Sequence, residues 1–376
     1  MKPEVKHILP LLFLLCCVTL HAADKDAVAG VQLEETLDEV VVTGSEPRSG
    51  VVERIDARTL SSLAGASGSF ENILKILPGV HSSNELSSQY SVRGGSYDEN
   101  LVYVNGVEIY RPMLTRTGQQ EGLSFINHNM VSTVDFSTGG FGAEFGDKMS
   151  SVLNVVYRRP TSFGGSAEAN LLGAAAACDF ALPDKKLGGV IGIRHKRSAY
   201  LLRSLDVKGE YNPSFSDLQA ALYMEPSKNL TLSLLGSYAL NRYRFTPTNR
   251  ETSLGTLDNP LQFTMYYEGG EDDLTQNLLG ALTAKYRLAS VVLGFTASAS
   301  SMLEQERYDI LGEYWLRQTV ADADVSHNTS DIGVGASFDH ARTSAATNIY
   351  AAEHTGSWYH RDGALKWGIK VLHYRV

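Results

Sequence analysis

Residues Ser91–Pro112 read SVRGGSYDENLVYVNGVEIYRP, and the interpretation of the whole chain starts from them. The stretch predicts a Gly-rich turn, a strand, a tight turn and a second strand. Because side chains alternate along a strand, Leu101 and Tyr103 share one face of the first strand. Val102 and Val104 share the opposite face. The segment is therefore a candidate β-hairpin.

The turn of this hairpin is Asn105-Gly106. Both residue types tolerate a positive φ, which a type I′ turn requires at its two central positions. The segments before and after the hairpin indicate which kind of domain contains it.

The composition is that of a folded protein that does not bind nucleic acid. The chain has 376 residues, a formal net charge of -9, 43% hydrophobic residues and 20% charged residues. Such a composition is not that of a disordered chain, and the length allows two or three domains. The acidic balance and the lack of a basic cluster argue against nucleic acid as the partner.

Residues 1–22 have the pattern of a secretory signal peptide. Lys2 and Lys6 precede an apolar segment over Ile8–Leu20, and Ala22 is a small residue at the expected cleavage site. The apolar run is too short to span a bilayer comfortably. Cleavage would leave Cys178 as the single cysteine, so we expect neither a disulfide framework nor a cysteine-based metal site.

Two short segments follow the signal. Residues 23–36 are polar and acidic without a periodic pattern, and we interpret them as a flexible tether. Residues 37–44 read LDEVVVTG, and Val40, Val41 and Val42 favour an extended backbone. This second segment is either the first strand of the next domain or a peptide that adds to the sheet edge of a partner.

Residues 45–160 predict one small α/β domain. Within 51–79 we expect two helices, of which Asp56 caps the first. The second carries an apolar stripe of Phe70, Ile73, Leu74 and Leu77 at helical spacing. Pro78-Gly79 ends it.

The hairpin lies in the middle of this domain, and two strands follow it. We expect them over Val131–Phe136 and Ser151–Tyr157. Four glycines crowd Gly139–Gly146 between them, and we interpret that run as tight turns rather than a phosphate-binding loop, because no Lys-Ser or Lys-Thr follows.

From residue 161 to 376 the sequence alternates between an apolar face and a polar or small face, as in Leu230, Leu232, Leu234, Tyr238 and Leu240. This alternation is typical of transmembrane β-barrel strands. A soluble sandwich would also alternate. Small and charged residues on the polar face and aromatic residues near strand ends favour the barrel. We expect tight turns at Pro226–Asn229 and Leu288–Ser290, and long loops at Thr246–Leu261 and Leu311–Val325.

Patterns for catalysis are missing from the sequence. It contains neither HExxH nor GxSxG, and its histidines are scattered. The acidic run of Glu271, Asp272 and Asp273 is interpreted as a solvated loop. We therefore expect no enzyme activity, no catalytic residue, no metal site and no cofactor.

Together these segments resemble the TonB-dependent outer-membrane receptors, in which a plug domain fills the lumen of a β-barrel. DEVVVTG at Asp38–Gly44 is similar to the TonB box, and LPGV at Leu77–Val80 is similar to the end of a plug helix. VRGG at Val92–Gly95 resembles the family's Arg-Gly turn, and Leu101–Tyr110 resembles its hairpin, with Asn105 where Asp is usual. GGFGAEFG from 139 to 146 resembles its Gly-rich run, and the texture resembles receptors from Bacteroidetes.

The resemblance implies a fold class. An α/β plug domain, a small mixed sheet with helices, would be followed by transmembrane antiparallel β-barrel strands. The segments would be a signal peptide (1–22), a tether (23–36), a TonB-box-like segment (37–44), the plug (45–160) and the N-terminal part of the barrel (161–376). We expect about nine barrel strands, whereas plugged transporters close with about 22. The barrel would then be incomplete, and the chain a fragment or a truncated product.

The resemblance also implies a function. The chain would be a receptor in the outer membrane of a Gram-negative bacterium. It would import a scarce ligand, such as an iron-siderophore or another metal complex, with energy from the proton-motive force. Its partners would be TonB with the ExbB–ExbD motor, the ligand and outer-membrane lipid.

The implied site residues fall into three groups. Those expected to contact TonB are Asp38, Glu39, Val40, Val41, Val42 and Thr43. Those expected to shape the plug are Pro78, Gly79, Arg93, Gly94, Gly95, Asn105, Gly106, Gly140 and Gly146. Arg93 is expected to pair with a barrel carboxylate, and the alternative is direct contact with the ligand. The ligand-facing candidates are Asn84, Gln89, Tyr90, Arg111 and Arg116.

Other functions remain open on the sequence. An outer-membrane module could bind a ligand or an adhesion partner without energised transport, and a truncated receptor could lack function. A secreted, soluble β protein would also show alternating strands.

Overall fold

The computed structural model describes residues 52–56, 71–82, 88–112, 124–182, 186–197, 199, 209–256, 259–320, 328–361 and 363–376. All of them belong to a compact unit that spans Arg48–Val376. The tether and the TonB-box-like segment lie outside the described residues. So do the first expected helix beyond Asp56 and the candidates Asn84 and Arg116.

Five strands form the first sheet, called here the small sheet, in the order β1-β6-β7-β4-β5. β4 pairs with β7 in parallel, and the other neighbours are antiparallel, so the sheet is mixed. A two-stranded sheet, β2 with β3, lies outside it. The strands are β1 (Val52–Asp56), β2 (Val80–His81), β3 (Ser91–Val92), β4 (Asn100–Val104), β5 (Val107–Glu108), β6 (Val131–Ser137) and β7 (Ser151–Tyr157).

The hairpin prediction is confirmed. β4 and β5 are joined by Asn105 and Gly106, whose φ angles are 54° and 79°. Val102 and Val104 lie in the main hydrophobic core. Leu101 and Tyr103 face the other way and belong to a second cluster, with Val152, Phe141 and Phe145 around them.

The second predicted helix is much shorter in the structure than the sequence indicated. Among the described residues, the helical segments are α3 (Glu71–Leu74), which is a single turn, the 3₁₀ helices η1 (Tyr97–Glu99) and η2 (His128–Met130), and the helical residue Ala199. Ile73 and Leu74 of the predicted stripe are buried as expected. The predicted end of this helix at Pro78-Gly79 is wrong, because the helix ends at Leu74 and turns follow it.

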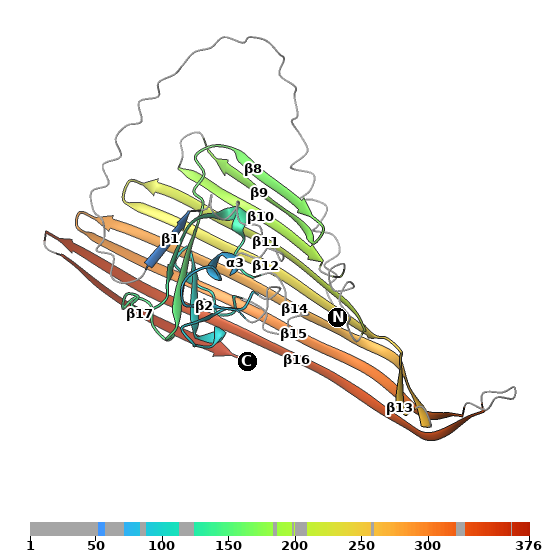
Figure 1. Ribbon diagram of the computed structural model, residues 1–376. Coiled ribbons are helices and arrows are strands. Elements are labelled where there is room, and N and C mark those ends of the chain that lie inside the picture. The colour runs from blue at the N-terminus through green and yellow to red at the C-terminus, as the bar shows by residue number, and fades with distance from the viewer. Residues whose placement is uncertain are drawn as a thin grey trace, which may run out of the picture. The chain divides into compact units, whose positions relative to one another are not determined.

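Ten strands form the second sheet, called here the long sheet. Nine of them follow the order β17-β16-β15-β14-β12-β11-β10-β9-β8, and β13 pairs with β14 (Figure 1). Neighbouring strands in the long sheet pair in antiparallel fashion. The strands are β8 (Gly164–Asn170), β9 (Gly173–Ala181), β10 (Leu187–Arg197), β11 (Gly209–Ser227), β12 (Leu230–Pro247), β13 (Arg250–Thr256), β14 (Asn259–Leu288), β15 (Val291–Val320), β16 (Asn328–His360) and β17 (Gly363–Arg375).

The tight turns of the long sheet lie where the sequence predicted them. β11 and β12 are joined at Lys228-Asn229, and β14 and β15 at Ala289-Ser290. The long loops at 246–261 and 311–325 are wrong in large part, because β13 and the end of β15 occupy them. The longest strands reach 30 to 33 residues and so exceed the length of an ordinary spanning strand.

In the part of the chain that the structure describes, no helix has the length and apolar character needed to cross a membrane.

Candidate functional site

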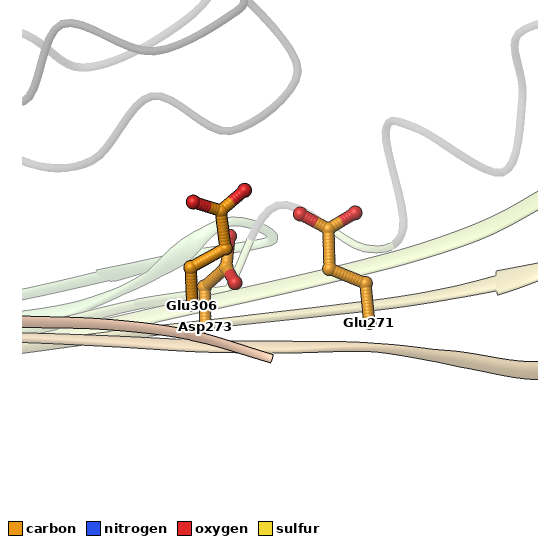
Figure 2. A group of neighbouring side chains, drawn as sticks. All are labelled: Glu271, Asp273 and Glu306. Carbon is orange, nitrogen blue, oxygen red and sulfur yellow. The ribbon is translucent and has the colours of Figure 1, made fainter. Parts of the chain in front are cut away.

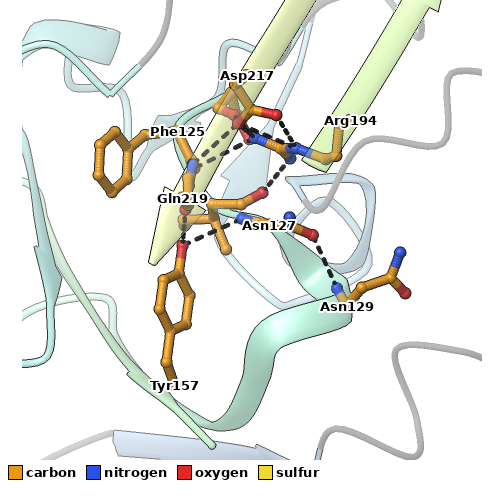
Figure 3. A network of polar contacts seen from close by, with 9 residues as sticks. Phe125, Asn127, Asn129, Tyr157, Arg194, Asp217 and Gln219 are labelled. Carbon is orange, nitrogen blue, oxygen red and sulfur yellow. Dashed lines mark hydrogen bonds and ion pairs between the residues drawn. The ribbon is translucent and has the colours of Figure 1, made fainter. Parts of the chain in front are cut away.

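The two sheets meet through a buried polar network (Figure 3). Arg194 on β10 forms an ion pair with Asp217 on β11, and both side chains are about 95% buried. The Arg194 guanidinium also donates hydrogen bonds to the backbone carbonyls of Ile126 (2.6 Å) and Ser124 (2.8 Å). One long-sheet arginine thus holds the segment that leads into η2.

Gln219 and Tyr157 continue the network. The Gln219 amide donates to the carbonyl of Phe125 and to Asp217 (2.9 Å). The Tyr157 hydroxyl donates to Gln219 Oε1 at 2.7 Å and accepts from the Asn127 N–H at 3.2 Å. Burial raises the pKa of the Tyr157 phenol, so it stays protonated and can act as the donor.

The hairpin turn forms a second junction between the sheets. Asn105 Nδ2 donates to the Tyr223 hydroxyl on β11 at 2.9 Å, and Asn105 Oδ1 accepts from the Tyr157 N–H at 2.8 Å. The Tyr223 hydroxyl in turn donates to the Tyr157 carbonyl at 3.3 Å. An amide can donate and accept at once, whereas a carboxylate can only accept. Asn105 therefore suits this position better than an aspartate would.

We expect Asn105→Asp to destabilise the complete protein by about 1 kcal/mol, the usual net contribution of one hydrogen bond. Asp keeps the positive φ and the contact to Tyr157, but it loses the donor to Tyr223. Urea unfolding would measure the change. Asn105→Gly is the matched variant, because it keeps the turn and removes both side-chain bonds. A Gly variant as stable as the parent would contradict the assigned contacts.

Arg111, rather than Arg93, pairs with a carboxylate of the long sheet. Arg111, after β5, forms an ion pair with Glu304 on β15 at 2.9 Å. Arg93 is exposed, and no ion pair between described residues includes it. Its backbone N–H donates to the Gly79 carbonyl, and its φ is 50°. The prediction that Arg93 pairs with a carboxylate of the long sheet is therefore wrong for the described residues.

Two lysines of β17 form ion pairs, one with the small sheet and one with the Gly-rich run. Lys370 forms an ion pair with Glu108 and lies 5.9 Å from the ring centre of Tyr103. Lys366 lies 3.4 Å from Glu144 in the Gly-rich run. Burial, with a smaller effect from Glu108, raises the pKa of Tyr103 to about 12, so this phenol is neutral.

The other ligand-facing candidates have different surroundings. Tyr90 is 1% exposed and packs edge-on against Phe136, so the structure contradicts its ligand-facing role. Gln89 is half-buried, and its carbonyl accepts from the Ser82 hydroxyl at 3.0 Å. Arg111 lines a cavity, as described next.

That cavity lies between the two sheets. Tyr110, Arg111 and Phe125 border it on one side, and Asn241, Asn277 and other residues of the long sheet border it on the other. Its lining combines amides and hydroxyls with apolar groups, so it can hold a molecule that presents both kinds of surface.

The predicted structural glycines adopt several conformations. Gly79, Gly94, Gly106 and Gly140 have positive φ angles of 81°, 84°, 79° and 66°. A Cβ on Gly95 would lie 1.8 Å from the Ser150 hydroxyl oxygen, so a side chain there would displace Ser150. Gly146 has open space around it. Pro78 stands in the turn after α3.

Three carboxylates gather on β14 and β15, at Glu271, Asp273 and Glu306 (Figure 2). Their oxygens lie within 4.8 Å of one another. Glu271 and Asp273 belong to a strand, and Asp273 is 3% exposed, so the interpretation as a solvated loop is wrong. Carboxylate oxygens suit hard cations, but acidic groups also cluster without one.

Comparison with known proteins points to one family. Residues 48–151 match the model of the TonB-dependent Receptor Plug Domain. The chain is 29% identical over 153 residues to the TonB-dependent transporter Oar of Myxococcus xanthus, a match that covers 37% of this chain and 14% of that protein. The chain therefore spans about one seventh of this curated relative.

Solved structures also align with the chain. The siderophore receptor PirA from Pseudomonas aeruginosa is 12% identical, with a TM-score of 0.39, and the alignment covers 86% of this chain and 75% of PirA. The outer membrane transporter YddB from Escherichia coli is 10% identical, with a TM-score of 0.43, and the alignment covers 86% of this chain and 56% of YddB.

Proposed function

Since the chain is a TonB-dependent receptor of the outer membrane, with a plug domain and part of a barrel, we propose that it imports a scarce ligand with energy delivered by TonB. The small sheet belongs to the plug, and the long sheet to the barrel wall. The family is one of transporters and not of enzymes. We further propose the domain limits given above, with residues 45–160 as the plug.

One observation supports gating by the plug. Polar contacts with the barrel wall are distributed over the plug, through Arg194, Asn105, Arg111 and Lys370, and they accompany an apolar cluster that also contains Val190 of the long sheet. The polar contacts can break and reform with water present, because water replaces the lost hydrogen bonds. Such contacts suit a plug that must move aside during transport.

The energy would enter at the TonB-box-like segment. Val40, Val41 and Val42 are strand formers on a tether, and a free strand can pair with a sheet edge of a partner through main-chain hydrogen bonds. We propose TonB, driven by the ExbB–ExbD motor, as that partner. The ligand would be an iron-siderophore or another metal complex, held next to the cavity beside Arg111.

Val41→Pro in the complete receptor tests this function. Proline removes the N–H and fixes φ, so strand pairing at residue 41 is lost. We expect uptake of a radiolabelled iron complex by cells to fall to background, while binding of the complex to the same cells is unchanged. Val28→Pro, in the tether, is the matched control and should leave uptake intact.

Two results would contradict the proposal. Uptake that survives Val41→Pro would contradict the assignment of this segment as the TonB box. Binding of the complex with no uptake in the unmodified cells would instead favour a binding module without energised transport.

A further inference from the structure

The barrel wall has an inward and an outward face that can be told apart residue by residue. Ser237, Asn241 and Asn277 line the cavity against the plug. Because side chains alternate along strands, their neighbours face away from the plug. Tyr238 is such a neighbour, and it is 43% exposed.

Seven titratable residues meet on this outward face, across four adjacent strands. The pairing register places Arg244 opposite Asp272, Arg307 opposite Arg342, and Asp309 opposite His340. We call the group the basic belt, and its members are Arg242, Arg244, Asp272, Arg307, Asp309, His340 and Arg342.

The basic belt carries more positive than negative charge. Each aspartate has a close arginine partner, Arg242 for Asp272 at 2.6 Å and Arg342 for Asp309 at 2.5 Å. Arg244 lies farther from Asp272, at 3.7 Å, and Arg307 is exposed. Four guanidinium groups therefore face two carboxylates before His340 is counted.

The excess charge is limited to one level of the wall. On the side of the tight turns, the same face of β14 carries Leu274, Leu278 and Leu282. On the opposite side it carries Glu268, and β15 carries Glu313, and both are exposed. The basic belt is thus bounded by an apolar band on the side of the tight turns and by acidic side chains on the opposite side.

The height of the apolar band places the belt beside lipid headgroups. From Tyr286 to Leu274 the strand covers about 40 Å at about 3.4 Å per residue. At a tilt of about 40°, this corresponds to a height of roughly 30 Å, the thickness of the hydrocarbon core. The belt comes next, on the side where β13 extends the sheet and where barrels have their longer external loops.

We propose that the basic belt binds the phosphate groups of an anionic lipid in the outer leaflet of the outer membrane. Guanidinium groups present paired N–H donors that match phosphate oxygens. The belt's own ion pairs are roughly half exposed, and such pairs contribute little to stability. An arginine can therefore turn from aspartate to phosphate at small cost.

The test uses the complete receptor, purified in detergent and titrated with bisphosphorylated lipid A, with bound lipid counted by native mass spectrometry. The variant R244Q/R307Q removes the excess charge and keeps the two close ion pairs. We expect at least a tenfold weaker apparent affinity. R317Q/R361Q, at the half-buried Arg317 and the exposed Arg361, is the control and should bind as the parent does.

Two further arms separate the sources of phosphate. Dephosphorylated lipid A should bind weakly to every variant, and millimolar inorganic phosphate should not displace the bound lipid. Equal binding by R244Q/R307Q and the parent, or equal binding of dephosphorylated lipid A, would overturn the proposal. Efficient displacement of the bound lipid by inorganic phosphate would show that the basic belt recognises free phosphate rather than a lipid headgroup. Heat-modifiable migration on gels checks that each variant is folded. If the double variant is not folded, R307Q alone replaces it, with an expected loss of about threefold in apparent affinity.

Discussion

Arg194→Met is expected to destabilise the docked plug by about 3–5 kcal/mol, the largest effect of any single change in the interface. The substitution leaves the Asp217 carboxylate about 95% buried without its cation. It also removes the donors to the carbonyls of Ser124 and Ile126. A buried charge without a partner is costly because the protein interior solvates it poorly. The midpoint of urea unfolding of the complete receptor would measure the loss.

Two further variants separate this mechanism from a general loss of packing. Arg54→Met removes an ion pair with Asp135 whose arginine side chain is 60% exposed, and it should cost at most about 1 kcal/mol. Arg194→Met combined with Asp217→Leu removes both charges and should recover a large part of the loss. A double variant less stable than Arg194→Met would contradict the assigned role of the ion pair.

Gly192→Val is expected to destabilise the same interface by about 1–3 kcal/mol through overpacking. Gly192 faces the plug from β10, and a Cβ there would lie 2.5 Å from Asn127 Nδ2 and 2.6 Å from Met130 Sδ. Both neighbours flank or form η2 and are fully buried, so neither can move aside freely. We expect the segment around η2 to lose protection, which limited proteolysis of the complete receptor would detect.

Gly236→Val is the matched control. Gly236 lies in β12 of the same wall, and a Cβ there would have open space around it. Valine favours strands, so this change should be neutral or slightly stabilising. Equal protease sensitivity of the two variants would show that a general effect on the barrel, rather than contact with η2, causes the change.

Local chemistry made the hairpin predictable from the sequence. The faces of β4 follow from strict alternation, and the Asn105-Gly106 turn follows from its tolerance of positive φ. Neither property depends on distant residues. The stripe around Ile73 and Leu74 was likewise correct about burial, but an apolar spacing that fits a helix does not require a helix of that length.

The interface network depends on register and could not be predicted in full. In β10, Ile191 and Ile193 are 41% and 54% exposed, while Gly192 and Arg194 alternate with them and face the plug. The sequence does show an arginine on the strand face that otherwise carries small residues, and this pattern indicates a buried cation. Its partner Asp217 is 23 residues away and is found only when the β10–β11 register is known.

The two incorrect loops have a related cause. Residues 250–256 and the end of β15 read as polar connections, yet they pair with β14 and β16. Polar residues are tolerated in strands that rise beyond a membrane, because water solvates both of their faces. The similar proteins named above come from Myxococcus xanthus, Pseudomonas aeruginosa and Escherichia coli, so the resemblance to Bacteroidetes receptors stays a prediction.

The pairing of β1 with β6 has a consequence for assembly. Most neighbours in the barrel wall are consecutive hairpins, joined by as few as two residues, so each closes a short loop. β1 instead joins β6 after an intervening segment from residue 57 to 132. Loop-closure entropy makes that step roughly 3 kcal/mol more costly than a two-residue closure.

Contact order therefore differs between the two sheets, and so does the expected sequence of folding events. The wall can grow strand by strand, whereas the edge of the plug that carries β1 is placed late. By the same reasoning, β1 is the plug strand that costs least to release. It is also the described strand nearest in sequence to Val40–Val42, the segment on which TonB is proposed to pull.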